Sequence, residues 1–136
     1  MIRVLFDNNI WNSFLIGKQL NTLLDVFGRP DVVVCYCDEL EQEFLNVAHR
    51  PKILRYVNEE QIERVHQLMT QFCELFEVGD TASITNRDPK DIYLLALAES
   101  VPVDYIVSGD KDLTDLHQHA GIPILKYVEL LEILNV

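Results

Sequence analysis

Four acidic residues lie beside predicted strands, in positions from which their carboxylates can meet. Asp7 directly follows an apolar segment near the N-terminus, and Asp110 follows the apolar segment DYIV after a short turn. Glu43 lies in the helix predicted after a second strand, and Asp91 lies in the first turn of the helix that leads into the Asp110 strand. Carboxylates held close together repel one another, so such a cluster is costly unless divalent cations compensate the charge. The sequence therefore predicts a metal site built from these acids.

The chemistry that such a site would support is phosphodiester hydrolysis. Hard oxygen ligands such as carboxylates suit Mg²⁺ or Mn²⁺. Either ion can activate a water molecule and stabilise the negative charge that develops on a phosphodiester during cleavage. We therefore expect hydrolysis by a metal-activated water, with no covalent intermediate required.

Strands and helices that alternate along the chain are expected to position the acids. Apolar segments predict strands over 2–6, 32–36, 104–110 and 122–126, with a weak candidate at 76–78. Helical spacing of apolar residues predicts helices over 9–17, 20–27, 37–51, 58–76, 87–101 and 127–134, with a short helix in the polar turn after Asp110. This alternation favours an α/β fold in which helices cover both faces of a parallel sheet. Ligands bind beyond the carboxyl ends of the strands in such sheets, which is where we expect the acids to meet.

Each acid taken alone also has a simpler structural explanation. Asp88 and Asp91 suit the N-cap and the first turn of a helix. Asp7 could cap the helix that follows it, and Glu43 could be an ordinary solvated helix residue. The acids in the segment SGDKDLTDL could belong to a polar turn. It is their joint placement that favours a metal site.

The charge of the chain limits the kinds of partner that it can bind. Its 136 residues carry a formal net charge of −11, with 49% hydrophobic and 24% charged residues. This composition is typical of a soluble globular protein, and the length suits a single domain spanning 1–136. The net negative charge argues against a protein that binds nucleic acid through a broad basic surface. It suits a basic partner protein, and it does not exclude a metal-dependent enzyme.

The sequence offers no sign of a membrane segment or of a structural zinc site. No apolar run is long enough to span a bilayer, and Asp7 falls where a secretory signal would have its apolar core, so we expect a cytoplasmic protein with no membrane contact. Cys35, Cys37 and Cys73 have no second Cys or His pair at zinc spacing, so we expect reduced thiols.

Three segments, in order, resemble the PIN-domain nuclease family. VLFDNNIW is similar to the family's strand-Asp-Thr-Asn-apolar opening, with Asn9 on the Asn and Asn8 where Thr is usual. CDELEQEFLNVAHRPK resembles the segment Ser-x-x-Leu-x-x-Glu-apolar, which places Glu43 on the family's second acid. RDPKDIYLLALAESVPVDYIVSGDKDL follows the pattern Asp-x-x-Asp-helix-strand-(Thr/Ser)-Gly-Asp-x-Asp-Leu. The resemblance covers nearly the whole chain, and HRPK after the Glu43 helix makes it look like the VapC-like toxins.

The resemblance implies a fold, an activity and a set of site residues. The fold is a three-layer α/β/α PIN-like fold with a parallel sheet of order 3-2-1-4-5, and the activity is that of a Mg²⁺- or Mn²⁺-dependent ribonuclease. Strands 1 and 4 are neighbours in that order, which brings Asp7 and Asp110 together. The metal-facing residues that it implies are Asp7, Glu43, Asp91 and Asp110, with Asp112 as a further ligand. Residues that would orient these carboxylates or water are Asn9, Ser108 and Asp88.

The resemblance also implies partners, and it leaves two other functions open. It implies an RNA substrate with an exposed, single-stranded or looped phosphate, a cognate antitoxin protein as in a type II toxin–antitoxin pair, and a homodimer. A rival hypothesis is a PIN-like module that binds RNA or a protein partner without cutting, which its metal affinity would distinguish. A phospho-acceptor receiver domain fits poorly, because LFDNN lacks the pair of acids that such a domain needs after its first strand.

Overall fold

The computed structural model describes residues 1–17, 19–79 and 89–136, which contain one sheet of six strands. The strands are β1 (Ile2–Phe6), β2 (Val32–Tyr36), β3 (Glu74–Leu75), β4 (Tyr105–Val107), β5 (Gln118–His119) and β6 (Ile122–Leu125). Their spatial order is β3-β2-β1-β4-β6-β5. All pairings are parallel except that of β5 with β6. The predicted parallel order 3-2-1-4-5 is therefore confirmed, with β6 as the fifth predicted strand and β5 as an addition.

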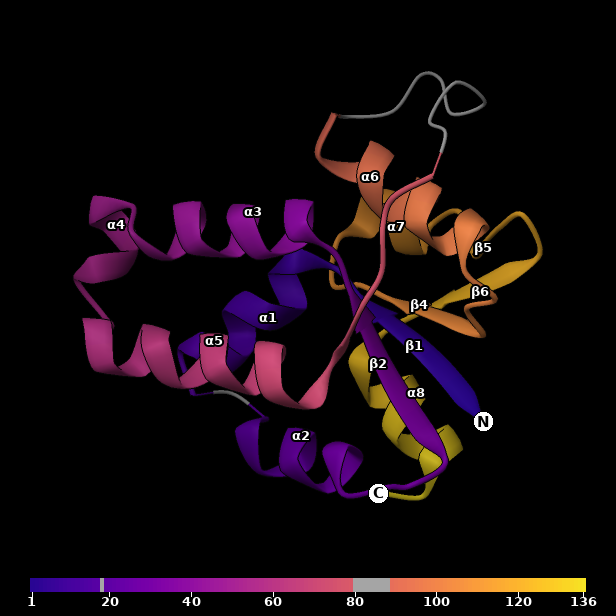
Figure 1. Ribbon diagram of the computed structural model, residues 1–136, viewed down its shortest axis with the longest axis horizontal. Helices are drawn as coiled ribbons and strands as arrows, with labels where there is room; N and C mark the ends of the chain where they lie inside the picture. Colours follow the sequence, from indigo (N-terminus) through magenta and orange to yellow (C-terminus); the bar gives the residue numbers. More distant parts are fainter. Residues whose placement is uncertain (18, 80–88) are drawn as a thin grey trace.

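Helices cover the sheet on both sides, as the alternation of elements predicted. They are α1 (Asn8–Leu15), α2 (Leu20–Phe27), α3 (Asp38–Ala48), α4 (Pro51–Leu54), α5 (Glu59–Phe72), α6 (Pro89–Ser100), α7 (Lys111–Thr114) and α8 (Tyr127–Leu134). The sheet lies between α6 and α8, and α3, α4 and α5 form an arm beyond its end (Figure 1). None of the helices in the described part of the chain combines the length and apolarity that a membrane span requires.

An aromatic cluster fixes the first helix against the first strand. Phe6 makes edge-to-face contacts with Trp11, Phe14 and Tyr127, at ring-centroid distances of 5.8, 5.9 and 5.9 Å. Trp11 and Phe14 are almost completely buried because their spacing places them on the inner face of α1. These two aromatic residues therefore belong to the core. Because Asp7 stands between β1 and α1, this packing also fixes its backbone.

Several elements have other ends than predicted: the helix predicted over 58–76 ends at Phe72, and the strand predicted over 104–110 covers only Tyr105–Val107. For two further elements the reason can be identified. α3 ends at Ala48 and Pro51 begins the separate helix α4, since proline suits a first helical position but lacks the N–H that a continuing helix needs. β3 covers 74–75 rather than 76–78. Its place is set by pairing of Glu74 with Cys35 and of Leu75 with Tyr36, whereas its own side chains are exposed.

The three cysteines are free, as predicted. Burial raises the pKa of the Cys35 thiol to about 12 and that of Cys37 to about 11. Burial also raises the pKa of Cys73 well above its ordinary value. Protonated, buried thiols are poor nucleophiles and poor metal ligands, so these residues act as small core side chains.

Candidate active site

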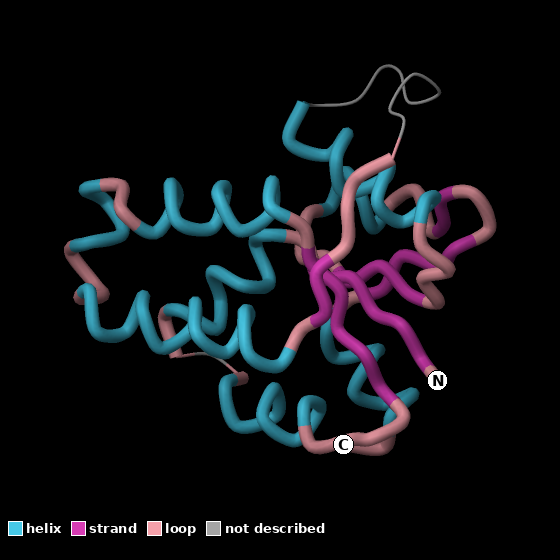
Figure 2. Tube along the Cα trace, viewed as in Figure 1, coloured by secondary structure: helices cyan, strands magenta, loops and turns pink. Residues whose placement is uncertain are grey.

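The structure brings the four predicted acids to one pocket at the carboxyl ends of the parallel strands. This pocket, called the acid pocket below, has a volume of about 200 Å³. Its lining residues are Asp7, Asn8, Asn9, Asn12, Glu43, Val47, Arg50, Asp91 and Asp110. The strands converge on this region, and α1 and α3 start there (Figure 2). Four elements contribute one acid each, because Asp7 follows β1, Glu43 lies in α3, Asp91 lies in α6 and Asp110 caps α7. The acids are far apart in sequence, and the strand order makes them neighbours.

Asp7 is held in place by hydrogen bonds from three directions. Its backbone N–H donates to the carbonyl oxygen of Val107 at 2.8 Å, which ties the end of β1 to the end of β4. One carboxylate oxygen accepts from the N–H of Asn8 at 2.7 Å, and the other accepts from the Ser108 hydroxyl at 2.8 Å. Asp7 is also the N-cap of α1. The capping explanation and the site explanation therefore apply to the same residue.

Ser108 links the first acid to the loop that carries Asp110. Its hydroxyl donates to Asp7 and accepts from the backbone N–H of Asp110 at 2.9 Å. Asn9 fixes the same loop from the other side, because its amide oxygen accepts from the N–H of Gly109 at 3.1 Å. Ser108 thus contacts one carboxylate directly, whereas Asn9 contacts the backbone of the loop; that the two orient metal ligands or water stays a prediction.

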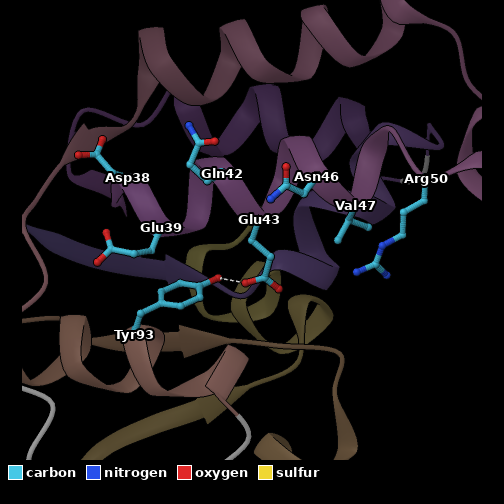
Figure 3. A pocket seen from close by; sticks show the side chains of 8 residues that line it. All are labelled: Asp38, Glu39, Gln42, Glu43, Asn46, Val47, Arg50 and Tyr93. Atoms are coloured by element: carbon cyan, nitrogen blue, oxygen red, sulfur yellow. Dashed lines mark hydrogen bonds between the residues drawn. The ribbon is translucent and has the colours of Figure 1, made fainter.

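Glu43 is oriented by a tyrosine from another helix. The Tyr93 hydroxyl, on α6, donates a hydrogen bond to the Glu43 carboxylate on α3 (Figure 3). Burial, followed by this hydrogen bond and the charge of Glu43, raises the pKa of Tyr93, so its hydroxyl stays protonated as a donor. The helix itself is anchored by Leu40 and Phe44, which are completely buried. Glu43 therefore projects from the side of α3 that faces α6.

The electrostatics of the acid pocket favour a positive ligand. Asp7 is 8% exposed, and burial is the largest cause that raises the pKa of its carboxyl group. The charges of Glu43 and Asp110 raise it further, whereas hydrogen bonds from Ser108 and Asn8 oppose the rise. The ionised form of Asp7 is thus destabilised by its loss of solvation and by repulsion from the neighbouring carboxylates. A bound cation would offset both effects.

The lining residues fit a hard divalent cation by their chemistry. Carboxylate oxygens are the ligands that Mg²⁺ and Mn²⁺ prefer, and the acid pocket offers four carboxylates. In residues 1–17, 19–79 and 89–136, however, no three His, Cys, Asp or Glu side chains are grouped so that they could hold a metal ion as they stand. Side-chain rotation would therefore have to accompany metal binding.

Two further acids of the segment SGDKDLTDL, Asp112 and Asp115, lie outside the acid pocket. Asp112 is exposed in the first turn of α7, outside the acid pocket, and its N–H donates to the Asp110 carboxylate at 3.0 Å. Asp115 forms an exposed ion pair with Lys111 at 3.0 Å. Asp88 falls outside the described residues. The direct contact of Asp112 with this site is thus through its backbone.

Tyr93, which contacts Glu43, and several residues that line the acid pocket were not predicted as site residues. Tyr93 lies in the apolar run IYLLALA, where its sequence context is the same as that of a core residue. Asn8 is 4% exposed, and its amide oxygen, like that of Asn12, is buried with no hydrogen-bond partner among the described residues. Arg50 follows α3 and brings a positive charge to the rim of the acid pocket. A basic residue shortly after the Glu43 helix was the available signal for it.

Comparison with known proteins identifies the fold family. The family model described as "PIN domain" matches residues 3–112. No curated protein sequence matches this one. Among solved structures, a chain in the crystal structure of VapBC2 from Rickettsia felis bound to a DNA fragment from its promoter is similar, with a TM-score of 0.61 at 11% sequence identity. The alignment covers 90% of this chain and 97% of that one. The family match spans most of the chain and includes all four acids of the acid pocket, so the chain belongs to the PIN domain family.

Proposed function

We propose that this protein is a metal-dependent endoribonuclease that hydrolyses RNA phosphodiesters, and that it is the toxin of a type II toxin–antitoxin pair. One observation carries the proposal. Within a PIN domain, a fold whose members are generally nucleases, four carboxylates from four elements line one pocket at the carboxyl ends of the strands. Nucleases of this chemistry need such a set of hard oxygen ligands.

The residues divide into those that would hold the ion and those that orient them. Asp7, Glu43, Asp91 and Asp110 would hold Mg²⁺ or Mn²⁺, with Asp112 as a further ligand. When bound, the ion supplies an activated water and stabilises the charge on the phosphodiester oxygens. Ser108 fixes one oxygen of Asp7, and Tyr93 fixes one oxygen of Glu43. Asn9 holds the Asp110 loop, and we assign Asp88 to the same orienting role.

The proposed partners follow from the family and from the surface charge. The substrate is a single-stranded or looped RNA, whose phosphate can reach a small recessed pocket. The structural neighbour is a VapBC2 complex, which supports a cognate antitoxin as the protein partner. A basic antitoxin segment would complement the net charge of −11. We place the protein in the cytoplasm as a single-domain homodimer, the location and assembly that suit this role.

A non-catalytic binding module is the second candidate, and one observation favours it. The described side chains do not form a ready metal site. A PIN domain that binds RNA or a protein without cutting would need no metal. Metal affinity and cleavage therefore separate the two functions.

The decisive experiment is a cleavage assay of the purified protein on pooled RNA. Reactions with EDTA, Mg²⁺ or Mn²⁺ would be compared with the same reactions of Asp110→Asn and of the matched surface variant Asp115→Asn. We expect cleavage that requires a divalent ion, is lost in Asp110→Asn and is unchanged in Asp115→Asn, whose carboxylate lies outside the acid pocket. Cleavage in EDTA, or full activity of folded Asp110→Asn, would contradict the proposal. Absence of both cleavage and metal binding would establish the binding module instead.

A further inference from the structure

A second pocket opens beside the acid pocket and shares its wall. It is called the side pocket below and has a volume of about 590 Å³. Glu43, Val47 and Arg50 line both pockets, so the two are continuous. A ligand whose reacting group lies among the acids would therefore extend into the side pocket. The volume lies within the range of about 300–1,000 Å³ that is typical of ligand sites in proteins.

The side pocket has the side chains that bind a nucleobase. The ring of Tyr93 reaches into it from α6, opposite α3 (Figure 3). Gln42 and Asn46 stand one helical turn apart on α3 and are exposed, so their amides are available to hydrogen-bond the edge of a base. Aromatic rings beside amide groups are the combination by which proteins recognise unstacked bases of single-stranded RNA.

We propose that the side pocket binds the base of the nucleotide next to the scissile phosphate and prefers a base that carries an exocyclic amino group. This inference rests on the proposed function and adds its substrate selectivity. Besides the two amides, the side pocket is lined by Asp38, Glu39 and Glu43. Ionised carboxylates only accept hydrogen bonds. Adenine, cytosine and guanine each offer an amino group as a donor, whereas uracil has none and presents a carbonyl oxygen in its place.

The charge distribution along the side pocket also sets the direction of the nucleotide. Asp38 and Glu39 lie at one end of α3, and Arg50 lies at the other, next to the acid pocket (Figure 3). A guanidinium group binds phosphate through parallel hydrogen bonds. We therefore place the phosphate at Arg50 and the base toward Gln42 and Asn46. The acids would also suit a basic peptide, but such a peptide would meet Arg50 and would not need the Tyr93 ring, so we assign the pocket to RNA and make a peptide an outcome of the test.

Binding of short RNA, measured apart from cleavage, tests the inference. The full chain carrying Asp110→Asn, which keeps RNA intact, would be titrated in Mg²⁺ against fluorescent single-stranded hexamers of A, C or U. We expect A and C to bind about tenfold more tightly than U, the discrimination typical of one or two base-edge hydrogen bonds. Adding Asp38→Asn and Glu39→Gln, which replace two acceptor-only groups by amides that also donate, should reduce the ratio to about threefold or less. The same kind of change at two exposed acids on α5, Glu60→Gln with Glu63→Gln, should leave it unchanged.

The outcomes separate this inference from the proposed function. Equal binding of the three hexamers, or a preference that survives the changes at Asp38 and Glu39, would overturn the side pocket assignment. A competition experiment gives a further outcome. If an arginine-rich peptide displaces the RNA and free nucleotides do not, the pocket is a peptide site and the assignment is overturned. If the wild-type protein cuts RNA with no base preference beside the cut, the assignment is overturned but the ribonuclease function is supported. The expected preference in a protein that cuts nothing would support the assignment and overturn the ribonuclease.

Discussion

Ser108 links two of the acids by hydrogen bonds. It is completely buried, and its hydroxyl contacts the Asp7 carboxylate and the Asp110 backbone. A buried hydroxyl with two hydrogen bonds holds its partners more rigidly than a solvated one, because neither bond can be exchanged for water. One buried oxygen atom therefore joins the Asp7 carboxylate to the Asp110 backbone, in addition to the β1–β4 pairing and the Asn9 contact.

We predict that Ser108→Ala lowers both stability and activity. Loss of the two hydrogen bonds should cost about 1–3 kcal/mol in the free energy of unfolding. Activity with saturating metal should fall about ten- to a hundredfold, as for other residues that orient metal ligands. Urea denaturation and the cleavage assay measure the two effects. The control is Ser13→Ala, which removes a hydroxyl that bonds within α1, and we expect a change within about 0.5 kcal/mol. Equal costs at the two serines would contradict the prediction.

Asp7 should destabilise the metal-free protein at neutral pH. Its folded-state pKa lies above the ordinary value of 3.8, so the folded protein binds this proton more tightly than the unfolded chain does. Stability should therefore fall as the pH rises from 3.8 through the raised pKa of the folded state. Asp7→Asn should then stabilise the protein at pH 7 in EDTA, with a smaller gain near pH 4.

Denaturation curves at the two pH values would check this sign. The matched control is Asp25→Asn on α2, an exposed carboxylate that should show no comparable gain. A loss of stability in Asp7→Asn at pH 7 would mean that the hydrogen bonds from Ser108 and Asn8 outweigh the burial of the charge.

Sequence reasoning located the acids but not all of their neighbours. Asp7 and Asp110 could be placed because one directly follows a strand and the other follows a strand after a short turn, and strand ends meet in a parallel sheet. Ser108 and Asn9 were named from the resemblance, and the structure supplies their contacts. Tyr93 could not be found, because a tyrosine in an apolar helix is equally suited to a core. Its role depends on how closely α6 approaches α3, which no local pattern encodes.

At the scale of elements, α5 depends on its first turn. Asn58 accepts from the N–H of Gln61 at 2.9 Å, and the Gln61 side chain accepts from the N–H of Asn58 at 2.9 Å. This capping box satisfies two backbone donors that the helix leaves free. α5 packs on α3, which carries Glu43, so the cap supports the site indirectly.

We predict that Asn58→Ala costs about 1 kcal/mol in the free energy of unfolding, the usual effect of losing an N-cap side chain. Chemical denaturation measures it. Asn21→Ala, an exposed position inside α2, is the control and should change stability by no more than about 0.5 kcal/mol. If the two variants unfold alike, the capping box contributes nothing.

Elements with strong local signals were predicted well, and weak ones were not. The helix predicted over 127–134 has those bounds in the structure, because its apolar spacing and flanking residues agree. β5 was missed since it has only two residues and is bounded by left-handed backbone: His117 before it has a φ of 62°, and Ala120 and Gly121 in the turn after it have φ values of 51° and 82°. Left-handed backbone at His117 and Ala120 is imposed by the pairing of β5 with β6 rather than signalled by residue type.

At the scale of the whole molecule, the family resemblance implied the strand order, whereas the alternation of elements predicted only a parallel sheet covered by helices. The acidity of the chain bears on its stability. A net charge of −11 repels itself, and the acid pocket concentrates part of it. A ligand that binds the folded state stabilises it, by about 2.7 kcal/mol at one hundred times its dissociation constant. Metal ions should therefore stabilise the entire fold.

We predict that Mg²⁺ or Mn²⁺ raises the melting temperature by several degrees over that in EDTA. Calorimetry or a thermal-shift assay would detect the rise. Sodium chloride at matched ionic strength controls for simple screening of charge, and Asp7→Asn with Asp110→Asn controls for the acid pocket. A similar rise in salt alone, or in the double variant, would show that the ions act on the general charge and have no specific site.

The sheet ends in very short strands at both edges of the described structure. β3 and β5, the outermost strands, have two residues each, and β5 runs antiparallel to its neighbour. A longer edge strand would present a row of unpaired amides and carbonyls, on which a strand from another molecule could grow. Here such a template is almost absent. Copies of this protein should therefore resist fibrillar aggregation at high concentration, and any specific self-association should use helical faces.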